Sequence, residues 1–257
     1  WRTDPSAEAL DLDGVRALRF APPGGVARRG TVLHLHGGAF RIGVPEQVGP
    51  FAAALAARCD VAVVCPVYRL APEAPFPAAL HDGRTAMTAL MKQGCGPLIL
   101  AGDSAGGGLA ASLASNAPHD PLSPVGLVLL SAWLDLTVTA PAYRHNAASD
   151  ALFSIEAAGE AARLYLQGHD ARDPLASPLH AGVAGFPPTF VSVGGGEVLA
   201  DDARAFAALL HAAGVAVTLD EVPGMEHVAV TRDMALPGAR RTFDATSVFI
   251  NAILGAT

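Results

Sequence analysis

One serine of this chain lies in surroundings that favour covalent chemistry. The motif G-x-S-x-G runs from Gly102 to Gly106 and has Ser104 at its centre. The apolar run Leu98–Ala101 precedes it, and an alanine- and leucine-rich helical pattern follows. A serine in a tight strand-to-helix turn can act as a nucleophile, and the flanking glycines avoid clashes in so sharp a bend. We therefore predict that Ser104 is a nucleophile. The alternative is a glycine-rich turn that only packs a helix against a sheet.

A second glycine-rich segment, HGGAF at His36–Phe40, directly follows the apolar run Thr31–Leu35. Glycines in such a loop let backbone N–H groups point into a cleft, where they can stabilise a negatively charged oxygen. We expect His36 to shape the loop through hydrogen bonds, and a plain glycine hinge is the alternative interpretation. The predicted oxyanion donors are the backbone N–H groups of Gly37, Gly38, Ala39 and Ala105.

A nucleophilic serine needs a histidine base, and the base needs an acid that orients it. Among the histidines after Ser104, only His227 lies in a loop that follows the last predicted strand. The acid is expected just past the preceding strand, where Glu197 lies in a glycine-rich loop and Asp201 begins a helix. Carboxylates in a first helical turn are favoured by the helix dipole alone. We therefore predict Glu197 as the acid and keep Asp201 as the alternative.

Short β-rich runs alternate with longer helical patterns along the chain. Apolar runs without polar alternation indicate strands that are covered on both faces, as in a mostly parallel sheet. The predicted strands are Thr31–Leu35, Val61–Val64, Leu98–Ala101, Gly126–Leu130, Thr189–Val193 and Val215–Val222. The predicted helices are Ala78–Lys92, Ser104–Ala114, Ser154–Leu166, a segment after Leu199, and Thr242–Leu254. This alternation predicts a doubly wound α/β fold, with the candidate residues in loops at the sheet's carboxyl edge.

The composition excludes several classes of partner. The 257 residues are 51% hydrophobic and 16% charged, with a net charge of −7. The absence of a basic run excludes nucleic acid and anionic membranes as expected partners. The longest apolar stretch, Val125–Leu134, is interrupted by Ser131 and is too short to span a bilayer. Three cysteines without CxxC spacing argue against a disulfide framework and a zinc site.

Several motifs in order resemble the hormone-sensitive-lipase-like branch of the α/β-hydrolases, the bacterial carboxylesterases of that group. They comprise HGGAF at His36–Phe40, YRLAPE at Tyr68–Glu73, PFPAAL at Pro75–Leu80, GDSAGG at Gly102–Gly107, DPLASPL at Asp173–Leu179, GGEVLADDARAFA at Gly195–Ala207 and GMEHV at Gly224–Val228. The resemblance implies an α/β-hydrolase fold and a Ser104–His227–Glu197 triad. It also implies hydrolysis of short-chain carboxylic esters through an acyl-enzyme, with no metal or organic cofactor.

The resemblance also carries expectations about the surroundings of the site. Arg69 and Glu73 are expected to form a buried pair, and Ala39 stands where the family usually has glycine. Ala39 can still donate its N–H if its φ is negative. We take Phe40, Trp133 and Val228 as candidate pocket residues, although Phe40 and Trp133 could equally belong to the core.

We expect one α/β-hydrolase domain over residues 1–257, with a reduced cap. Only 35 residues precede His36, so part of the usual cap is expected to be missing. The cap would come from the N-terminus and from about residues 143–170.

Two other functions use the same residues. An amide or lactam hydrolase needs the same groups, and some plant hormone receptors resemble this family but lack a working histidine. All three triad positions are chemically competent here, which favours an enzyme over a small-ligand receptor. A homodimer through the edge strand Val215–Val222 is expected by analogy. A cytoplasmic location is expected, and a leader ahead of Trp1 is the alternative.

Overall fold

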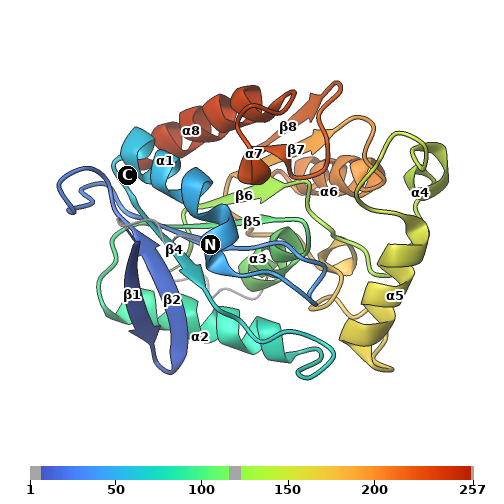
Figure 1. The fold of residues 1–257 in the computed structure, drawn as a ribbon, viewed down its shortest axis with the longest axis horizontal. Helices are drawn as coiled ribbons and strands as arrows, with labels where there is room; N and C mark the ends of the chain where they lie inside the picture. Colours follow the sequence, from blue (N-terminus) through green and yellow to red (C-terminus); the bar gives the residue numbers. More distant parts are fainter. Residues whose placement is uncertain (1–6, 116–122, 256–257) are drawn as a thin grey trace.

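A single twisted sheet forms the centre of the molecule (Figure 1). The computed structural model describes residues 7–115 and 123–255. Within these residues the strand order is β1-β2-β4-β3-β5-β6-β7-β8. The strands are β1 (Ala7–Leu12), β2 (Val15–Phe20), β3 (Thr31–Leu35), β4 (Ala62–Pro66), β5 (Leu98–Asp103), β6 (Gly126–Leu130), β7 (Thr189–Gly194) and β8 (Val217–Val222). Strands β1 and β2 are antiparallel to their neighbours, and the ladder from β4 to β8 is parallel. The predicted α/β fold is confirmed.

The central strands are apolar because helices cover both faces of the sheet. On β5, Leu98 and Leu100 point into the core cluster that includes residues of α2, α3 and α6. Their neighbours Ile99 and Ala101 point into the cluster that includes residues of α1 and α8. Successive side chains of a strand point to opposite faces, so a strand covered on both sides has no polar alternation.

The helices divide between the two faces, with α1 and α8 on one side and α2 and α3 on the other (Figure 1). The α-helices are α1 (Gly49–Cys59), α2 (Ala78–Lys92), α3 (Ala105–Ser115), α4 (Ala142–His145), α5 (Ile155–Leu166), α6 (Ala200–Ala212), α7 (Ala229–Arg232) and α8 (Ala239–Gly255). Two short 3₁₀ helices are η1 (Pro45–Val48) and η2 (Pro178–His180). None of the helices in the described ranges is long and apolar enough to cross a bilayer.

A hairpin and a helix near the start of the chain were not predicted from the sequence. A hairpin joins β1 to β2 through Asp13 and Gly14, both of which have positive φ (54° and 92°). Asp-Gly between alternating residues is a strong hairpin signal, since this turn requires positive φ at both positions. Helix α1 was also missed; it begins with Gly49 and Pro50 and packs against α8.

The expected buried pair between Arg69 and Glu73 is wrong. The Arg69 guanidinium instead pairs with Asp82 at 2.8 Å, and its side chain is 58% exposed. Asp82 also accepts a hydrogen bond from the Arg69 backbone N–H at 2.8 Å. Asp82 lies one turn into α2 and therefore reaches the loop after β4, whereas Glu73 is exposed.

Four neighbouring parallel strands end next to the candidate residues. Ser104 directly follows β5, Ser131 directly follows β6, Glu197 lies three residues after β7, and His227 lies five residues after β8. The carboxyl ends of parallel strands meet at one edge of the sheet, which is where ligands bind in open α/β folds. The topology therefore brings together residues that lie far apart in the sequence.

Candidate active site

Ser104 occupies a strained turn between β5 and α3. Its φ is +51°, a left-handed conformation that is uncommon for a residue with a side chain. A Cβ atom on Gly102 would collide with the Gly106 carbonyl oxygen, and one on Gly106 would collide with the Leu35 carbonyl oxygen. The two glycines of the motif are thus required by the close approach of three backbone segments. The turn leaves the Ser104 hydroxyl facing the carboxyl edge of the sheet.

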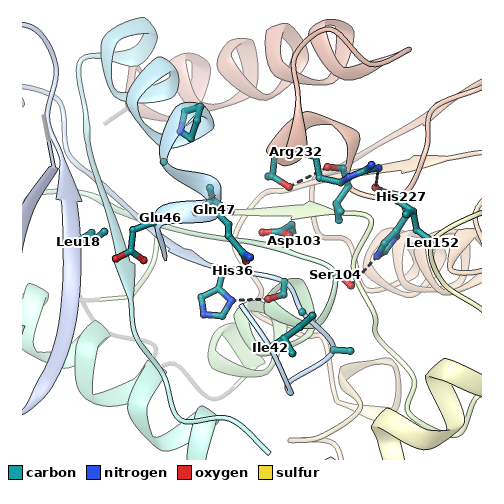
Figure 2. A pocket seen from close by; sticks show the side chains of 18 of the residues that line it. Leu18, His36, Ile42, Glu46, Gln47, Asp103, Ser104, Leu152, His227 and Arg232 are labelled. Carbon is teal, nitrogen blue, oxygen red and sulfur yellow. Dashed lines mark hydrogen bonds between the residues drawn. The ribbon is translucent and has the colours of Figure 1, made fainter. Parts of the chain in front are cut away.

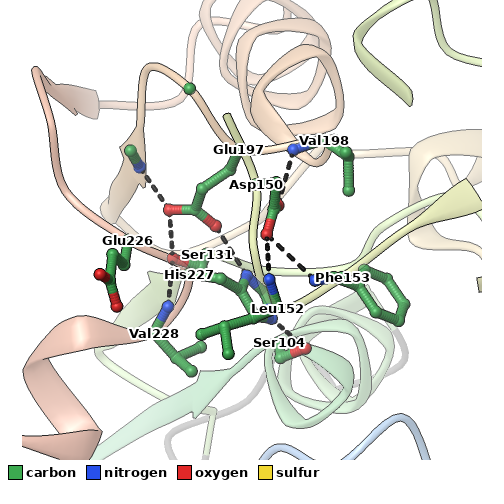
Figure 3. Close-up of polar contacts among 12 residues, drawn as sticks. Ser104, Ser131, Asp150, Leu152, Phe153, Glu197, Val198, Glu226, His227 and Val228 are labelled. Carbon is green, nitrogen blue, oxygen red and sulfur yellow. Dashed lines mark hydrogen bonds and ion pairs between the residues drawn. The ribbon is translucent and has the colours of Figure 1, made fainter. Parts of the chain in front are cut away.

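The structure brings Ser104, His227 and Glu197 into one hydrogen-bonded chain (Figure 3). The Ser104 Oγ lies 3.0 Å from His227 Nε2, and His227 Nδ1 lies 2.7 Å from Glu197 Oε2. All three residues are buried. The alternative acid, Asp201, lies elsewhere: its carboxylate accepts hydrogen bonds from the Ala142 N–H and the Arg204 guanidinium.

The Glu197 carboxylate is held on its other oxygen as well. Its Oε1 accepts hydrogen bonds from the Ser131 hydroxyl at 2.8 Å and from the Gly194 N–H at 2.5 Å. The Ser131 Oγ in turn accepts a hydrogen bond from the Val228 N–H at 3.2 Å. A carboxylate with partners on both oxygens has a fixed orientation. Ser131 therefore ties Glu197 to the loop that carries His227.

His227 lies in a charged and aromatic environment. Burial alone would lower its pKa, but the hydrogen bond and the charge of Glu197, together with the charges of Asp150 and Asp103, outweigh it and raise the pKa above the usual value. The Phe153 ring is stacked on the imidazole with centroids 5.7 Å apart. The Asp150 carboxylate holds this segment through the backbone N–H groups of Phe153 and Val198 (Figure 3).

The loop of the predicted oxyanion hole packs directly against Ser104. A Cβ atom on Gly37 would lie 3.2 Å from the Ser104 Cβ and 2.5 Å from the Asp103 carboxylate. The N–H groups of Gly38 and Ala39 donate to no other residue in 7–115 or 123–255. Ala105 begins α3, where an N–H group has no partner within the helix. These donors are therefore available to a ligand oxygen beside Ser104.

His36 has structural contacts of the kind expected from the sequence. Its Nδ1–H donates to the Gly37 carbonyl oxygen at 2.6 Å, and its ring stacks on Tyr68 at 4.3 Å. Burial lowers the pKa of His36. The Asp103 carboxylate accepts a hydrogen bond from the buried His34 ring at 2.9 Å. These contacts fix the loop and leave His36 no part in the chain that ends at Ser104.

A cavity of about 820 Å³ opens over Ser104 (Figure 2). Val228 lines it, as predicted. Phe40 and Trp133 do not line it, so their assignment to the pocket is corrected. Phe40 is stacked on Tyr165 at 3.8 Å, and Trp133 is fully buried with its ring 5.9 Å from that of Phe40. Both belong to the core that supports the oxyanion loop from behind.

This arrangement of site and fold is matched in known proteins. The family model described as the alpha/beta hydrolase fold matches residues 32–231. The chain belongs to the α/β-hydrolase family. The chain is similar to an esterase from the bacterial hormone-sensitive lipase family whose crystal structure is known, with 35% sequence identity and a TM-score of 0.93. The alignment covers 99% of this chain and 87% of the chain of that esterase. The resemblance to the hormone-sensitive-lipase-like branch is thereby confirmed.

Two curated relatives extend the comparison. An acetyl-hydrolase from Streptomyces hygroscopicus is 40% identical over 230 residues, which are 88% of this chain and 76% of that protein. The esterase LipU from Mycobacterium tuberculosis is 34% identical over 251 residues, which are 94% of this chain and 83% of that protein. This α/β-hydrolase therefore aligns with its relatives over nearly its whole length.

One detail of this α/β-hydrolase contradicts the expectation from the sequence. Ala39 has a φ of +53°, so the negative φ that was set as the condition for its role as a donor is not found. A residue with a Cβ adopts this conformation at a cost of about 1–2 kcal/mol, which accounts for the usual glycine there. Within the described part of the chain the Ala39 N–H has no acceptor, so the substitution strains the loop without removing a donor.

Ser131, like Asp150, is a polar residue of this hydrolase site that was not predicted. Its signal in the sequence is the interruption of the apolar stretch around β6 by a hydroxyl residue at the end of the strand. A polar side chain at that place faces the edge where the other loops meet. Its φ of +47° is also unusual, which indicates that the surrounding structure holds it in place.

Proposed function

We propose that this protein is a serine carboxylesterase in which Ser104, His227 and Glu197 form the catalytic triad. His227 Nε2 takes the Ser104 proton while Ser104 Oγ attacks the ester carbonyl carbon. The N–H groups of Gly38, Ala39 and Ala105 stabilise the oxyanion of the tetrahedral intermediate. His227 then gives the proton to the departing alcohol, which leaves an acyl group on Ser104.

The second half of the reaction uses the same groups. His227 takes a proton from water, the water oxygen attacks the acyl carbon, and the proton returns to Ser104 as the carboxylic acid leaves. Glu197 keeps Nδ1 protonated throughout, so Nε2 stays free to accept a proton, and it stabilises the imidazolium that forms in each step. The observation that carries this proposal is the continuous Ser104–His227–Glu197 hydrogen-bonded chain.

A phosphonate labelling experiment tests the nucleophile. An organophosphonate should add one covalent equivalent to the wild type and none to Ser104→Ala. Ester hydrolysis by Ser104→Ala should fall to a background about 10³-fold above water, which the oxyanion hole and binding alone supply. Ser112→Ala is the matched control because Ser112 is a buried serine of α3 outside the cavity lining. Labelling of Ser104→Ala would contradict the assignment.

We propose further that the substrates have short acyl chains of roughly C2 to C6. A buried CH₂ group is worth about 0.8 kcal/mol, so only an enclosing wall rewards a long chain. Two apolar residues of the cavity wall, Ile42 and Leu152, are 69% and 48% exposed. One relative is named an acetyl-hydrolase, which is consistent with a small acyl group. A p-nitrophenyl series from acetate to palmitate tests this, and a maximum at ten carbons or beyond would refute it.

Esters are favoured over amides or lactams because LipU and the protein of the matched crystal structure are both named esterases. A receptor that only binds its ligand is not favoured either, since the triad side chains are all in hydrogen-bonding contact. A panel of matched ester, amide and lactam substrates separates these functions. We expect turnover of the ester alone within the sensitivity of the assay.

We also propose a homodimer through the outer edge of β8, which pairs with β7 on one side only among the described strands. Leu219 of this strand is 38% exposed. Leu219→Lys should lower the mass measured by light scattering from dimer to monomer, whereas a wild-type monomer would refute the proposal.

A cytoplasmic location is proposed because Cys59, Cys65 and Cys95 are all free thiols. Cell fractionation against a marker of the culture medium tests it.

A further inference from the structure

The cavity extends to two sides of the nucleophile. One side, which we name the Glu46 arm, is lined by Leu18, His36, Glu46 and Gln47. Figure 2 shows these four labelled residues on one side of Ser104 and Leu152 and His227 on the other. An ester bound with its carbonyl at Ser104 can place one of its two parts, acyl or alcohol, in the Glu46 arm.

Most charged side chains that line the cavity already have a partner. The Arg232 guanidinium pairs with Glu226 at 3.0 Å, and the Arg41 guanidinium pairs with Glu160 at 3.5 Å. Asp103 is almost fully buried, and its carboxylate accepts a hydrogen bond from the His34 ring at 2.9 Å. The two arginine charges are compensated within the protein, and Asp103 is already engaged by a protein donor.

Glu46 differs from them. Among residues 7–115 and 123–255 its carboxylate has no hydrogen bond and no ion pair. It belongs to η1 and is half-buried, with the apolar side chains of Leu18 and Val48 also lining the cavity. A partly desolvated carboxylate interacts more strongly with a ligand charge than one in bulk water does.

No cation of the Glu46 arm neutralises this carboxylate. His36 is the one titratable base among the four residues of the arm, and burial lowers its pKa despite the nearby charge of Glu46. It is therefore neutral at pH 7. The only formal charge in the arm at that pH is the negative charge of Glu46.

We propose that Glu46 is a specificity-determining residue that selects esters with a cationic ammonium group on the part that lies in the Glu46 arm. The same charge discriminates against esters that carry a carboxylate on that part. The proposal rests on the proposed function, since it takes Ser104 as the point at which the ester is attacked. The substrate class expected for this protein is therefore amino or quaternary ammonium esters.

Two pairs of probes test the proposal. The first pair is butyrylcholine and its carbon isostere, in which a tert-butyl group replaces the trimethylammonium group. The second pair is the p-nitrophenyl esters of trimethylammonio-butanoate and of its tert-butyl isostere. The first pair carries the charge on the alcohol and the second on the acyl chain. A quaternary ammonium cannot attack its own ester, so both probes are stable. The measured quantity is the ratio of kcat/KM for the cationic ester to that for its isostere.

We expect Glu46→Gln to lower this ratio about two- to fivefold in one of the two pairs, as for a partly exposed ion pair. Glu46→Lys should lower it further, and added salt should lower the wild-type ratio. Glu8→Gln is the matched control because Glu8 lies on β1, is 60% exposed and does not line the cavity. It should leave both ratios unchanged.

An unchanged ratio in both pairs for Glu46→Gln and Glu46→Lys would overturn the proposal. An equal fall in both pairs, or a fall in Glu8→Gln, would also overturn it, since either result indicates a general field effect and not a contact in one arm. Hydrolysis of the neutral isosteres by the wild type, and its loss in Ser104→Ala, tests the proposed function separately. Failure of the selectivity is therefore distinguishable from failure of the catalytic assignment.

Discussion

Replacing Glu197 by glutamine should inactivate the protein through the tautomer of His227. The Oε1 position receives two hydrogen bonds, from the Gly194 N–H at 2.5 Å and from the Ser131 hydroxyl at 2.8 Å. The Gly194 N–H can only donate, so the amide oxygen of glutamine must take this position. The amide NH₂ group then faces His227 Nδ1, where the carboxylate oxygen now lies at 2.7 Å.

The consequence is that His227 adopts the wrong tautomer. Nδ1 must accept a hydrogen bond from the amide, so the neutral ring carries its proton on Nε2, which faces Ser104 at 3.0 Å. An Nε2–H cannot remove the serine proton. In serine proteases the comparable acid-to-amide change lowers kcat by about 10⁴-fold, or about 5 kcal/mol, and we expect a loss of this order for Glu197→Gln.

The matched control is Asp201→Asn, which removes one negative charge from a carboxylate only four residues away. Asp201 bonds to Ala142 and Arg204 and has no contact with His227. Its replacement should change kcat less than about fivefold, at the level of a surface hydrogen bond. Initial rates with p-nitrophenyl acetate, with circular dichroism to verify folding, measure both. If folded Asp201→Asn loses more activity than folded Glu197→Gln, the reasoning is refuted.

Three further predictions use other contacts of the site and core. The raised pKa of His227 should place the acid limb of kcat/KM above about pH 6.5, with activity rising as pH increases through the limb. An acid limb below about pH 6 would contradict the assignment of His227 as the base. Ser131→Ala removes one of the two donors to Glu197 Oε1, so kcat should fall by about tenfold. The acid limb should also move to higher pH, because the carboxylate then attracts the imidazolium more strongly. An unchanged pH profile would indicate that Ser131 has no positioning role. Burial, together with the charges of Asp135 and Asp201, raises the pKa of Asp202 to about 7, although backbone hydrogen bonds oppose this shift. Between about pH 4 and 7 the folded state therefore holds a proton that the unfolded state has lost. The free energy of unfolding should fall as pH rises through this range. Asp202→Asn should flatten that dependence in urea titrations at several pH values, and parallel curves for both proteins would exclude the effect.

The elements that carry the site were predictable because they combine pattern and chemistry. Strand β5 is an apolar run that ends at a G-x-S-x-G turn, and β7 and β8 end before loops that hold Glu197 and His227. Each of these signals lies within one short stretch of residues, so it can be recognised from the sequence alone. Their meeting point then follows from the parallel order of the strands.

What could not be predicted depends on contacts between distant segments. Asp82 and not Glu73 pairs with Arg69 because α2 turns back toward the loop after β4, a geometry that no local pattern encodes. The positive φ of Ala39 arises where its loop packs against the Ser104 turn. The β1–β2 hairpin had a local signal in Asp13 and Gly14, which was overlooked because the chain ahead of His36 was interpreted as part of a cap.

The placement of the candidate catalytic residues beyond the ends of adjacent parallel strands also has a consequence for refolding. Ser104 and His227 are 123 residues apart in sequence, so their contact requires closure of a long loop of chain. Non-local contacts of this kind form late, after the entropy of loop closure has been overcome. Helices such as α2 and α8 can form earlier from local interactions. During refolding from urea, far-UV circular dichroism should therefore recover ahead of esterase activity, and the regain of activity would time the moment at which the ladder from β5 to β8 is complete.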